Sequence, residues 1–174
     1  MKWDSVARSK LPRARIWERS SSLQDLERCG PKAVALYQYW NARRGVRLMP
    51  SRTDIDPLEM RQWLPRLTLV DVDGDGKQFT YRLVGTKIVE LLGVNPTGRL
   101  VETAWPEETA SSVVRSYDEV VQTRAPVFCR QTCQWLGDQE PSAWAIRLPL
   151  SSDGVEVDMV LAYLSDNITM LSQI

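Results

Sequence analysis

Residues 79–93 constrain the fold of this chain more than any other segment. Residues 79–84 alternate between apolar or aromatic and polar side chains, which is the pattern of a β-strand with two different faces. The strand is expected to end at Gly85, and residues 86–92 then have the pattern of a short amphipathic helix that ends at Gly93. A strand that leads directly into short helices is how several small ligand-sensing folds build one wall of a pocket.

The other expected elements are grouped by type along the chain. The helices are expected at about 23–28, 31–44, 56–64, 86–92, 100–104 and 106–124. The strands are expected at about 67–72, 79–84, 126–135, 142–150 and 155–164. Because the strands occur in groups and do not alternate regularly with helices, we expect an α+β fold built on an antiparallel sheet.

The helix at 56–64 is predicted from strong local signals. Asp56 has a side chain that can cap a helix, Pro57 suits the first helical position, and Glu59 lies three residues after the cap, as in a capping box. Pro65 cannot continue a helix and disfavours helical geometry in the residue before it. These signals predict that the helix ends at about residue 64.

A series of short motifs carries a resemblance to a known family. They are D-I-D-P at 54–57, L-P at 64–65, Y-R-L-V-G-T at 81–86, T-G-R at 97–99 and L-P-L-S at 148–151. In this order they resemble the motifs of a family of short, stand-alone bacterial PAS-like proteins, the fifth PAS subgroup, over roughly 32–166. The resemblance implies a five-stranded antiparallel sheet in the order 2-1-5-4-3, with short helices on one face that enclose a small cavity.

The chain is expected to have one domain with two terminal extensions. Residues 31–166 form the PAS-like domain with its N-terminal helices, 1–30 form a basic, partly flexible leader with a short helix, and 167–174 form a tail. The first 19 residues hold six basic and two acidic side chains and are broken by a proline. Such a segment is typical of a mobile tail, and the alternative is an arm that contacts a phosphate or an acidic partner.

Composition excludes several classes of function. The chain contains no histidine, which excludes Ser-His-Asp and Cys-His nucleophiles, His-ligated haem and imidazole-dependent zinc sites. An odd number of cysteines, three, with no secretory signal, indicates a reducing compartment, so we expect a cytoplasmic protein. No run of about eighteen apolar residues predicts a membrane span. Zero formal net charge provides no electrostatic basis for binding nucleic acid.

The better-known PAS branches bind cofactors through residues that this chain lacks. Haem-binding members commonly use a histidine ligand, and flavin photosensors use an adduct-forming cysteine in an Asn-Cys-Arg-type motif. The nearest match to that motif here is Asn95-Pro96, which has no thiol. We therefore predict no haem or flavin, and the expected ligand is an unidentified small molecule.

Two further patterns have structural explanations. Residues 71–76 imitate the first half of a calcium loop, but the twelfth position, which should be a bidentate Glu, is Arg82. We interpret the segment as a hairpin turn and predict no metal site. Cys129 and Cys133 lie on one face of an expected strand about 13 Å apart, too far for a disulfide. Buried packing is the favoured interpretation, and redox sensing is the alternative.

The predicted pocket lies between the sheet and residues 85–105. Its candidate ligand-binding residues are Tyr81, Leu83, Thr86, Ile88, Arg99 and Trp144. In a regular strand Tyr81 and Leu83 share one face, and backbone N–H groups near Thr97 and Gly98 could reach a ligand. A pocket of a few hundred Å³ is expected. Arg82 needs a carboxylate partner, either in a structural salt bridge or on a ligand.

These observations predict a non-enzymatic sensory or regulatory module. It is expected to bind a small organic ligand, to signal through contacts with an unknown protein, and to form a homodimer through the helices before residue 50. The alternative is an interaction scaffold whose cavity is filled by its own side chains. No catalytic residue is predicted, because no pair of carboxylates lies in a context that suggests acid–base catalysis.

Overall fold

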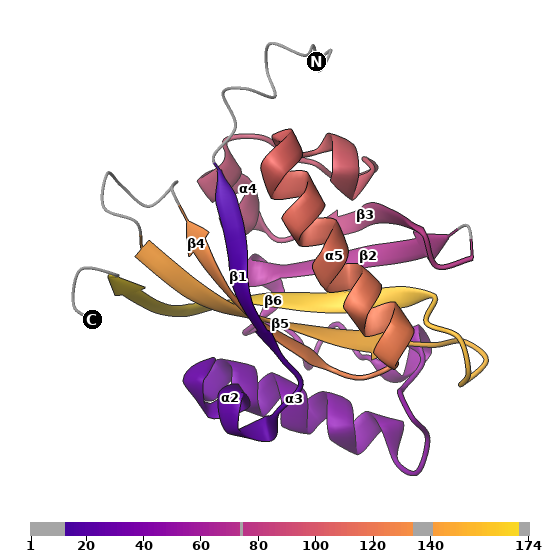
Figure 1. Cartoon of the computed structure of the whole chain (residues 1–174). Helices are drawn as coiled ribbons and strands as arrows, with labels where there is room; N and C mark the ends of the chain where they lie inside the picture. Colours follow the sequence, from indigo (N-terminus) through magenta and orange to yellow (C-terminus); the bar gives the residue numbers. More distant parts are fainter. Residues whose placement is uncertain (1–12, 74, 134–140, 171–174) are drawn as a thin grey trace.

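One antiparallel sheet of six strands forms the centre of the computed structural model, which describes residues 13–73, 75–133 and 141–170 (Figure 1). The strand order is β1-β4-β5-β6-β2-β3. The strands are β1 (Ala14–Ser20), β2 (Leu67–Asp73), β3 (Gln78–Val84), β4 (Val127–Cys133), β5 (Pro141–Leu150) and β6 (Met159–Met170). The α-helices are α2 (Leu23–Arg28), α3 (Pro31–Arg44), α4 (Thr86–Leu92) and α5 (Glu107–Thr123). Short 3-10 turns are η1 (Arg52–Asp54), η2 (Leu64–Arg66) and η3 (Val101–Thr103).

The predicted α+β class and the order of the five predicted strands are confirmed. Read from β3, the observed order is β3-β2-β6-β5-β4, which is 2-1-5-4-3 in the numbering of the predicted strands. The sheet is larger than expected, however, because β1 adds a sixth strand beside β4. The predicted leader residues 1–12 and tail residues 171–174 lie outside the described residues.

Strand β1 lies in the leader, where the sequence analysis assigned no strand. Ala14 and Ile16 are buried, whereas Arg15 and Arg19 are exposed, so the segment alternates as an edge strand does. The Ala14 N–H donates to Thr109 Oγ1 at 3.1 Å, and the Ile16 N–H donates to Ser112 Oγ at 2.8 Å. Side chains of α5 therefore satisfy backbone donors of an edge strand that would otherwise be open to pairing.

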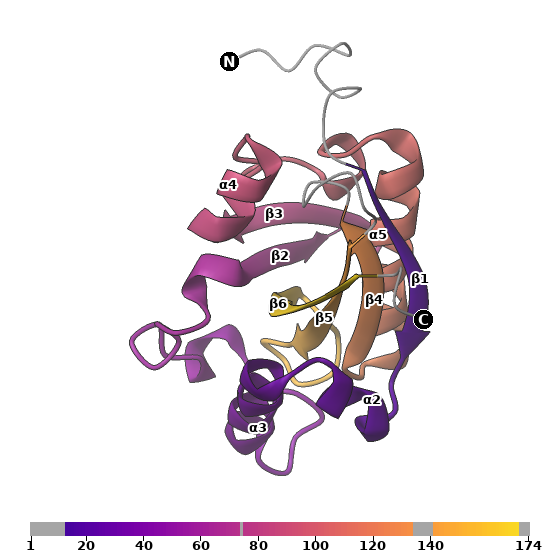
Figure 2. The same ribbon diagram turned by 90° about the vertical axis from the view of Figure 1, so that its left-hand side faces the viewer.

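Helices α5 and α3 cover opposite faces of the central strands (Figures 1 and 2). Val127 and Phe128 are neighbours on β4, so their side chains point to opposite faces of the sheet. Phe128 packs edge-on against Tyr37 of α3, with ring centroids 6.3 Å apart. Val127 pairs with Arg147 of β5, which packs against Tyr117 of α5. Helices α3 and α5 therefore pack on opposite faces of the same two strands, β4 and β5.

The predicted helix at 56–64 is wrong. Residues 57–63 form turns that lead into η2, although Asp56 does cap the first turn by accepting from the Leu58 N–H at 2.8 Å. Glu59 does not complete a capping box and forms an ion pair with Arg43 of α3. Trp63 is buried, and its Nε1 donates to the carbonyl oxygen of Lys32 at 2.8 Å. These tertiary contacts bind the segment to α3 and override its helical signals.

Within the described ranges, no helix combines the length and the apolar character that crossing a membrane requires.

Candidate functional site

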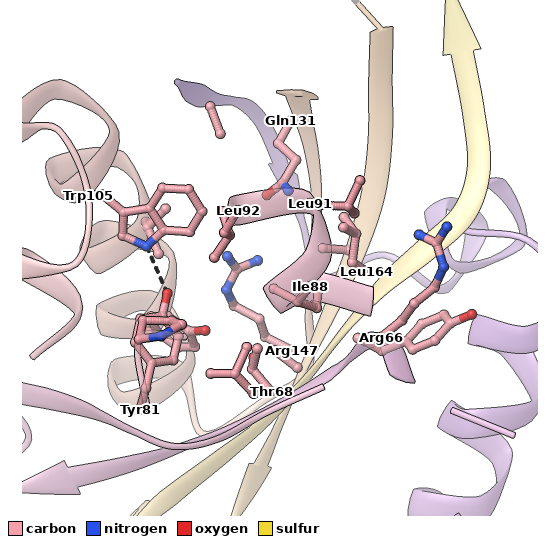
Figure 3. A pocket seen from close by; sticks show the side chains of 18 residues that line it. Arg66, Thr68, Tyr81, Ile88, Leu91, Leu92, Trp105, Gln131, Arg147 and Leu164 are labelled. Atoms are coloured by element: carbon pink, nitrogen blue, oxygen red, sulfur yellow. Dashed lines mark hydrogen bonds between the residues drawn. The ribbon is translucent and has the colours of Figure 1, made fainter. Parts of the chain in front are cut away.

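A cavity of about 70 Å³ lies between the sheet and helices α4 and α5 (Figure 3). Its apolar wall includes Val84, Ile88, Leu91, Leu92, Val113 and Leu164. Polar atoms enter the wall from Arg66, Thr68, Tyr81, Trp105, Tyr117, Gln131 and Arg147. One water needs about 10–15 Å³ of such volume, so the cavity has room for about five water-sized groups. It is smaller than the few hundred Å³ that the sequence analysis predicted.

Two of the predicted pocket residues, Tyr81 and Ile88, line this cavity. The other four, Leu83, Thr86, Arg99 and Trp144, are not among its lining residues in the described part of the chain. Thr86 is exposed at the first position of α4. Whether any of the six binds a ligand stays a prediction.

Leu83 lies on the wrong face because β3 contains a β-bulge. Leu69 of β2 pairs with Leu83, but the next residue of β2, Val70, pairs with Tyr81, which leaves Arg82 as an extra residue. A bulge of this kind reverses the alternation of side chains along the strand. Tyr81 is consequently 4% exposed and faces the cavity, whereas Leu83 is 43% exposed and faces away.

Trp144 lies on the opposite face of the sheet from the cavity. Its ring packs under Arg28 of α2, with the guanidinium carbon 4.8 Å from the ring centroid. The cavity is lined instead by Ala145 and Arg147 of the same strand. The prediction failed for Trp144 because the sequence does not indicate which face of β5 each helix covers.

The segment that contains Arg99 runs along the outer edge of β3. The Tyr81 N–H donates to the Arg99 carbonyl oxygen at 2.9 Å, and the Gly98 N–H donates to the Tyr81 carbonyl oxygen at 2.6 Å. The Thr97 N–H donates to Asn95 Oδ1 at 3.1 Å. The prediction that these N–H groups reach a ligand is therefore wrong, because they make bonds within the protein.

Arg147 is the most notable of the cavity residues that were not predicted from the sequence. Its side chain comes from the middle of β5, a strand that is buried along its whole length. The guanidinium carbon lies 4.8 Å from the centroid of the Tyr117 ring. Among the described residues, no hydrogen-bond acceptor reaches the buried Nε and Nη1 atoms. A basic residue inside the apolar run 143–150 was the signal that could have identified it.

Figure 3 places the Arg147 guanidinium at the centre of the ring of labelled side chains, with Tyr81 and Trp105 on one side and Arg66 on the other. Trp105 Nε1 donates to the Tyr81 hydroxyl at 2.9 Å. Burial raises the pKa of Tyr81 strongly, so its hydroxyl stays protonated at neutral pH. The site thus combines a cation and a neutral hydroxyl beside a mostly apolar wall.

The pKa of Arg147 reflects two opposing effects. Desolvation lowers it, whereas Coulombic attraction to Cys129, Tyr117 and Tyr81 raises it, with a net upward shift. The attraction requires those groups to be ionised. Because burial raises the pKa values of both Cys129 and Tyr81, these groups are neutral near pH 7. At that pH they supply dipoles to the guanidinium but no negative charge.

The other singled-out side chains have structural partners. Arg82 forms a salt bridge with Asp71 of β2 at 3.3 Å, which confirms the structural interpretation of this arginine. Cys129 is buried, and desolvation raises the pKa of its thiol. A buried thiol of this kind is a poor nucleophile, which disfavours redox sensing at Cys129. The side chain of Cys133 lies outside the described residues.

Comparison with known proteins agrees with this architecture. A family model described as a PAS domain matches residues 30–165. No curated protein is similar enough to the chain to count as a match. The matched segment includes strands β2 to β5, the first part of β6 and the helices α4 and α5 beside the cavity. The chain belongs to this PAS-domain family.

Proposed function

We propose that this protein is a sensor that binds a small organic molecule in the cavity between the sheet and helices α4 and α5. PAS domains are generally sensory, non-catalytic modules. The observation that carries the proposal is a cavity wall that is mostly apolar and into which a few polar groups converge, including Arg147 and Tyr81. Small-molecule sites have this composition, in which apolar surface supplies affinity and a few polar groups set orientation.

Strand β5 provides a physical route from the cavity to the N-terminal helices. Arg147 lines the cavity. Two residues further along β5, the carbonyl oxygen of Pro149 accepts a hydrogen bond from Trp40 Nε1 of α3 at 2.8 Å. Ser165 of β6 also donates to the Cys29 carbonyl oxygen, just before α3, at 2.6 Å. A ligand that favours one position of β5 would therefore shift the population of α3 positions, provided that it binds the two arrangements with different affinity.

For the output we propose self-association at the end of α3. Val46, Leu48 and Leu58 are among the most exposed large apolar side chains, at 105%, 59% and 67%. Val46 and Leu48 directly follow α3, and the turn that carries Leu58 is tied to α3 by the ion pair between Arg43 and Glu59. Apolar groups gathered beside a helix that senses the cavity suit contact with a second copy of the chain.

Native mass spectrometry of the purified protein tests the ligand-binding proposal. We expect a mass excess under native conditions that disappears on denaturation, and the released molecule can then be identified. In Ala145→Leu, the larger side chain fills part of the cavity and should abolish the excess. Ala42→Leu makes the same change on the exposed side of α3 and should retain it.

Two results would count against this function. The first is no retained molecule in the wild-type protein together with no thermal stabilisation by any member of a metabolite library. The second is equal retention by Ala145→Leu and Ala42→Leu. If Ala145→Leu fails to fold, Ala162→Val narrows the same cavity with a smaller increase in volume. If either of the two contradicting results is obtained, the interpretation of the protein as an interaction scaffold is preferred.

A further inference from the structure

The cavity carries positive charge without a negative counterpart. Its lining includes two arginines, Arg66 and Arg147, and no aspartate or glutamate in the described part of the chain. Arg66 is half-buried, and its Nη1 donates to the Ser165 carbonyl oxygen at 3.2 Å. Arg147 is 4% exposed, and its Nε and Nη1 have no acceptor among the described residues. The unbalanced charge is therefore concentrated at Arg147.

A buried guanidinium such as that of Arg147 destabilises the folded protein unless other interactions compensate its charge. Removing a charge from water costs several kcal/mol, and unmade hydrogen bonds add to that cost. The Tyr117 ring compensates part of it through a cation–π contact, in which the guanidinium carbon lies 4.8 Å from the ring centroid. Nε and Nη1 nevertheless have no acceptor among the described residues. The N–H groups of a guanidinium are satisfied by acceptors that lie in its plane.

We propose that the ligand is a short-chain monocarboxylate whose carboxylate binds the guanidinium of Arg147. The inference rests on the proposed function and specifies the ligand for the same cavity. A carboxylate matches the planar guanidinium and can accept two parallel hydrogen bonds from Nη1 and Nη2, which lie side by side at its end. The Tyr81 hydroxyl accepts from Trp105, so its own proton is available as a further donor at the cavity wall.

The size and polarity of the cavity restrict the rest of the ligand. A volume of about 70 Å³ suits only a few non-hydrogen atoms beyond the carboxylate. Ile88, Leu91 and Leu164 form an apolar surface that suits a short alkyl chain. Inorganic phosphate fits less well, because its four oxygens need more donors than this mostly apolar wall offers.

Titration calorimetry with sodium butyrate and its neutral isostere butyramide tests the proposal. Butyrate should bind at least about tenfold more tightly than butyramide, because the bond to Arg147 is charge-assisted. Acetate and propionate should also bind, whereas octanoate should not fit. Arg147→Met should abolish butyrate binding, and Arg147→Lys, which keeps the charge but not the planar fork, should weaken it. Arg82→Met makes the same change at an exposed arginine on β3 and should leave binding unchanged.

The unliganded variant separates a ligand-binding role from a structural one. If Arg147 serves a ligand, unliganded Arg147→Met should melt at the same temperature as the wild type or higher, because a buried uncompensated charge has been removed. A lower melting temperature, equal affinity for butyrate and butyramide, tighter binding of inorganic phosphate, or no binding of any acid at millimolar concentration would overturn the proposal. A neutral molecule retained by the wild type and excluded by Ala145→Leu would still leave the proposed function intact. Equal retention by Ala145→Leu and Ala42→Leu would remove both.

Discussion

Trp105 donates its indole N–H to the hydroxyl of Tyr81 across 2.9 Å, and both side chains are buried in the wall of the cavity. Tyr81 comes from β3, whereas Trp105 lies just before α5. The bond therefore connects the sheet to the helical side of the cavity at a point where both side chains are almost fully buried. A hydrogen bond in such a place is expensive to remove.

Tyr81→Phe should lower the free energy of unfolding by about 1–2 kcal/mol, because the indole N–H loses its acceptor. Urea denaturation measures the change. Trp105→Phe and the double variant complete a mutant cycle, and we expect a coupling energy of about 1 kcal/mol between the two sites. A coupling energy near zero would contradict the assigned bond.

Gly85→Ala should be among the most destabilising single changes in the chain. A Cβ at this position would lie 2.3 Å from the Leu64 carbonyl oxygen and 2.5 Å from that of Pro65, so backbone would have to move. We expect a loss of about 3 kcal/mol in the free energy of unfolding. The φ angle of Gly85 is −63°, which any residue adopts, so the effect is purely steric.

Gly154→Ala is the matched comparison for Gly85. Here φ is +77° and a Cβ would meet nothing within 4 Å, so only the left-handed backbone is unfavourable. We expect a loss of about 1 kcal/mol, smaller than that at Gly85. Equal losses at the two positions, measured by urea denaturation, would show that the close approach at Gly85 is relieved without penalty.

Stability should fall at alkaline pH because of Cys29. Burial raises the pKa of its thiol from 9.0 to about 12, so the folded state favours the neutral form. A raised pKa contributes stability that is fully present below about pH 9 and is lost as pH rises toward 12. At pH 10.5 the loss attributable to this group is about 2 kcal/mol.

The free energy of unfolding of Cys29→Ala should fall less between pH 8.5 and pH 10.5 than that of the wild type, and the difference should be about 2 kcal/mol. Urea denaturation at several pH values measures both slopes. Tyr163, whose pKa burial raises to about 12, titrates in both proteins and so cancels in the comparison. Parallel slopes would mean that the Cys29 thiol ionises as easily in the folded state as in the unfolded one.

Light scattering after size exclusion should find a homodimer at tens of micromolar protein. Specific dimer interfaces usually bury about 1,200 Å² or more in total, and Val46, Leu48 and Leu58 are the proposed centre of this one. Val46→Glu combined with Leu58→Glu should give a monomer. Val155→Glu, at a residue 52% exposed in the β5–β6 connection, is the control and should remain a dimer. A wild-type monomer would remove the proposal.

The strands β2 to β6 were predictable because each has a local sequence signal. Residues 79–83 alternate between apolar and polar side chains, whereas β5 is a nearly continuous apolar run. The motif resemblance supplied the order in which the strands pair. β1 was not predictable in this way, because three of its seven residues are charged and its stability comes from pairing with β4 and from α5. Non-local partners of this kind leave no local signal.

The cavity was only partly predictable for a similar reason. The sequence indicated Tyr81 and Ile88, but one extra residue, Arg82, reversed the alternation and moved Leu83 to the outside. A bulge depends on how two strands pair and does not appear in the pattern of either one alone. Arg147 was missed because an apolar run with one basic residue resembles an ordinary buried strand. Only the three-dimensional arrangement shows that no acid is among the described residues that line the cavity with it.

The position of β1 has a consequence for how the molecule is assembled during synthesis. Ala14 pairs with Cys133, so β1 leaves the ribosome long before its partner β4 and stays unpaired until that strand has been made. Contacts between residues so distant in sequence form late, because closing a long loop must come first. Since Ala14 also belongs to the cavity wall, that wall closes late in folding. A small molecule present during translation could therefore reach Arg147 and Tyr81 before β1 completes its side of the cavity.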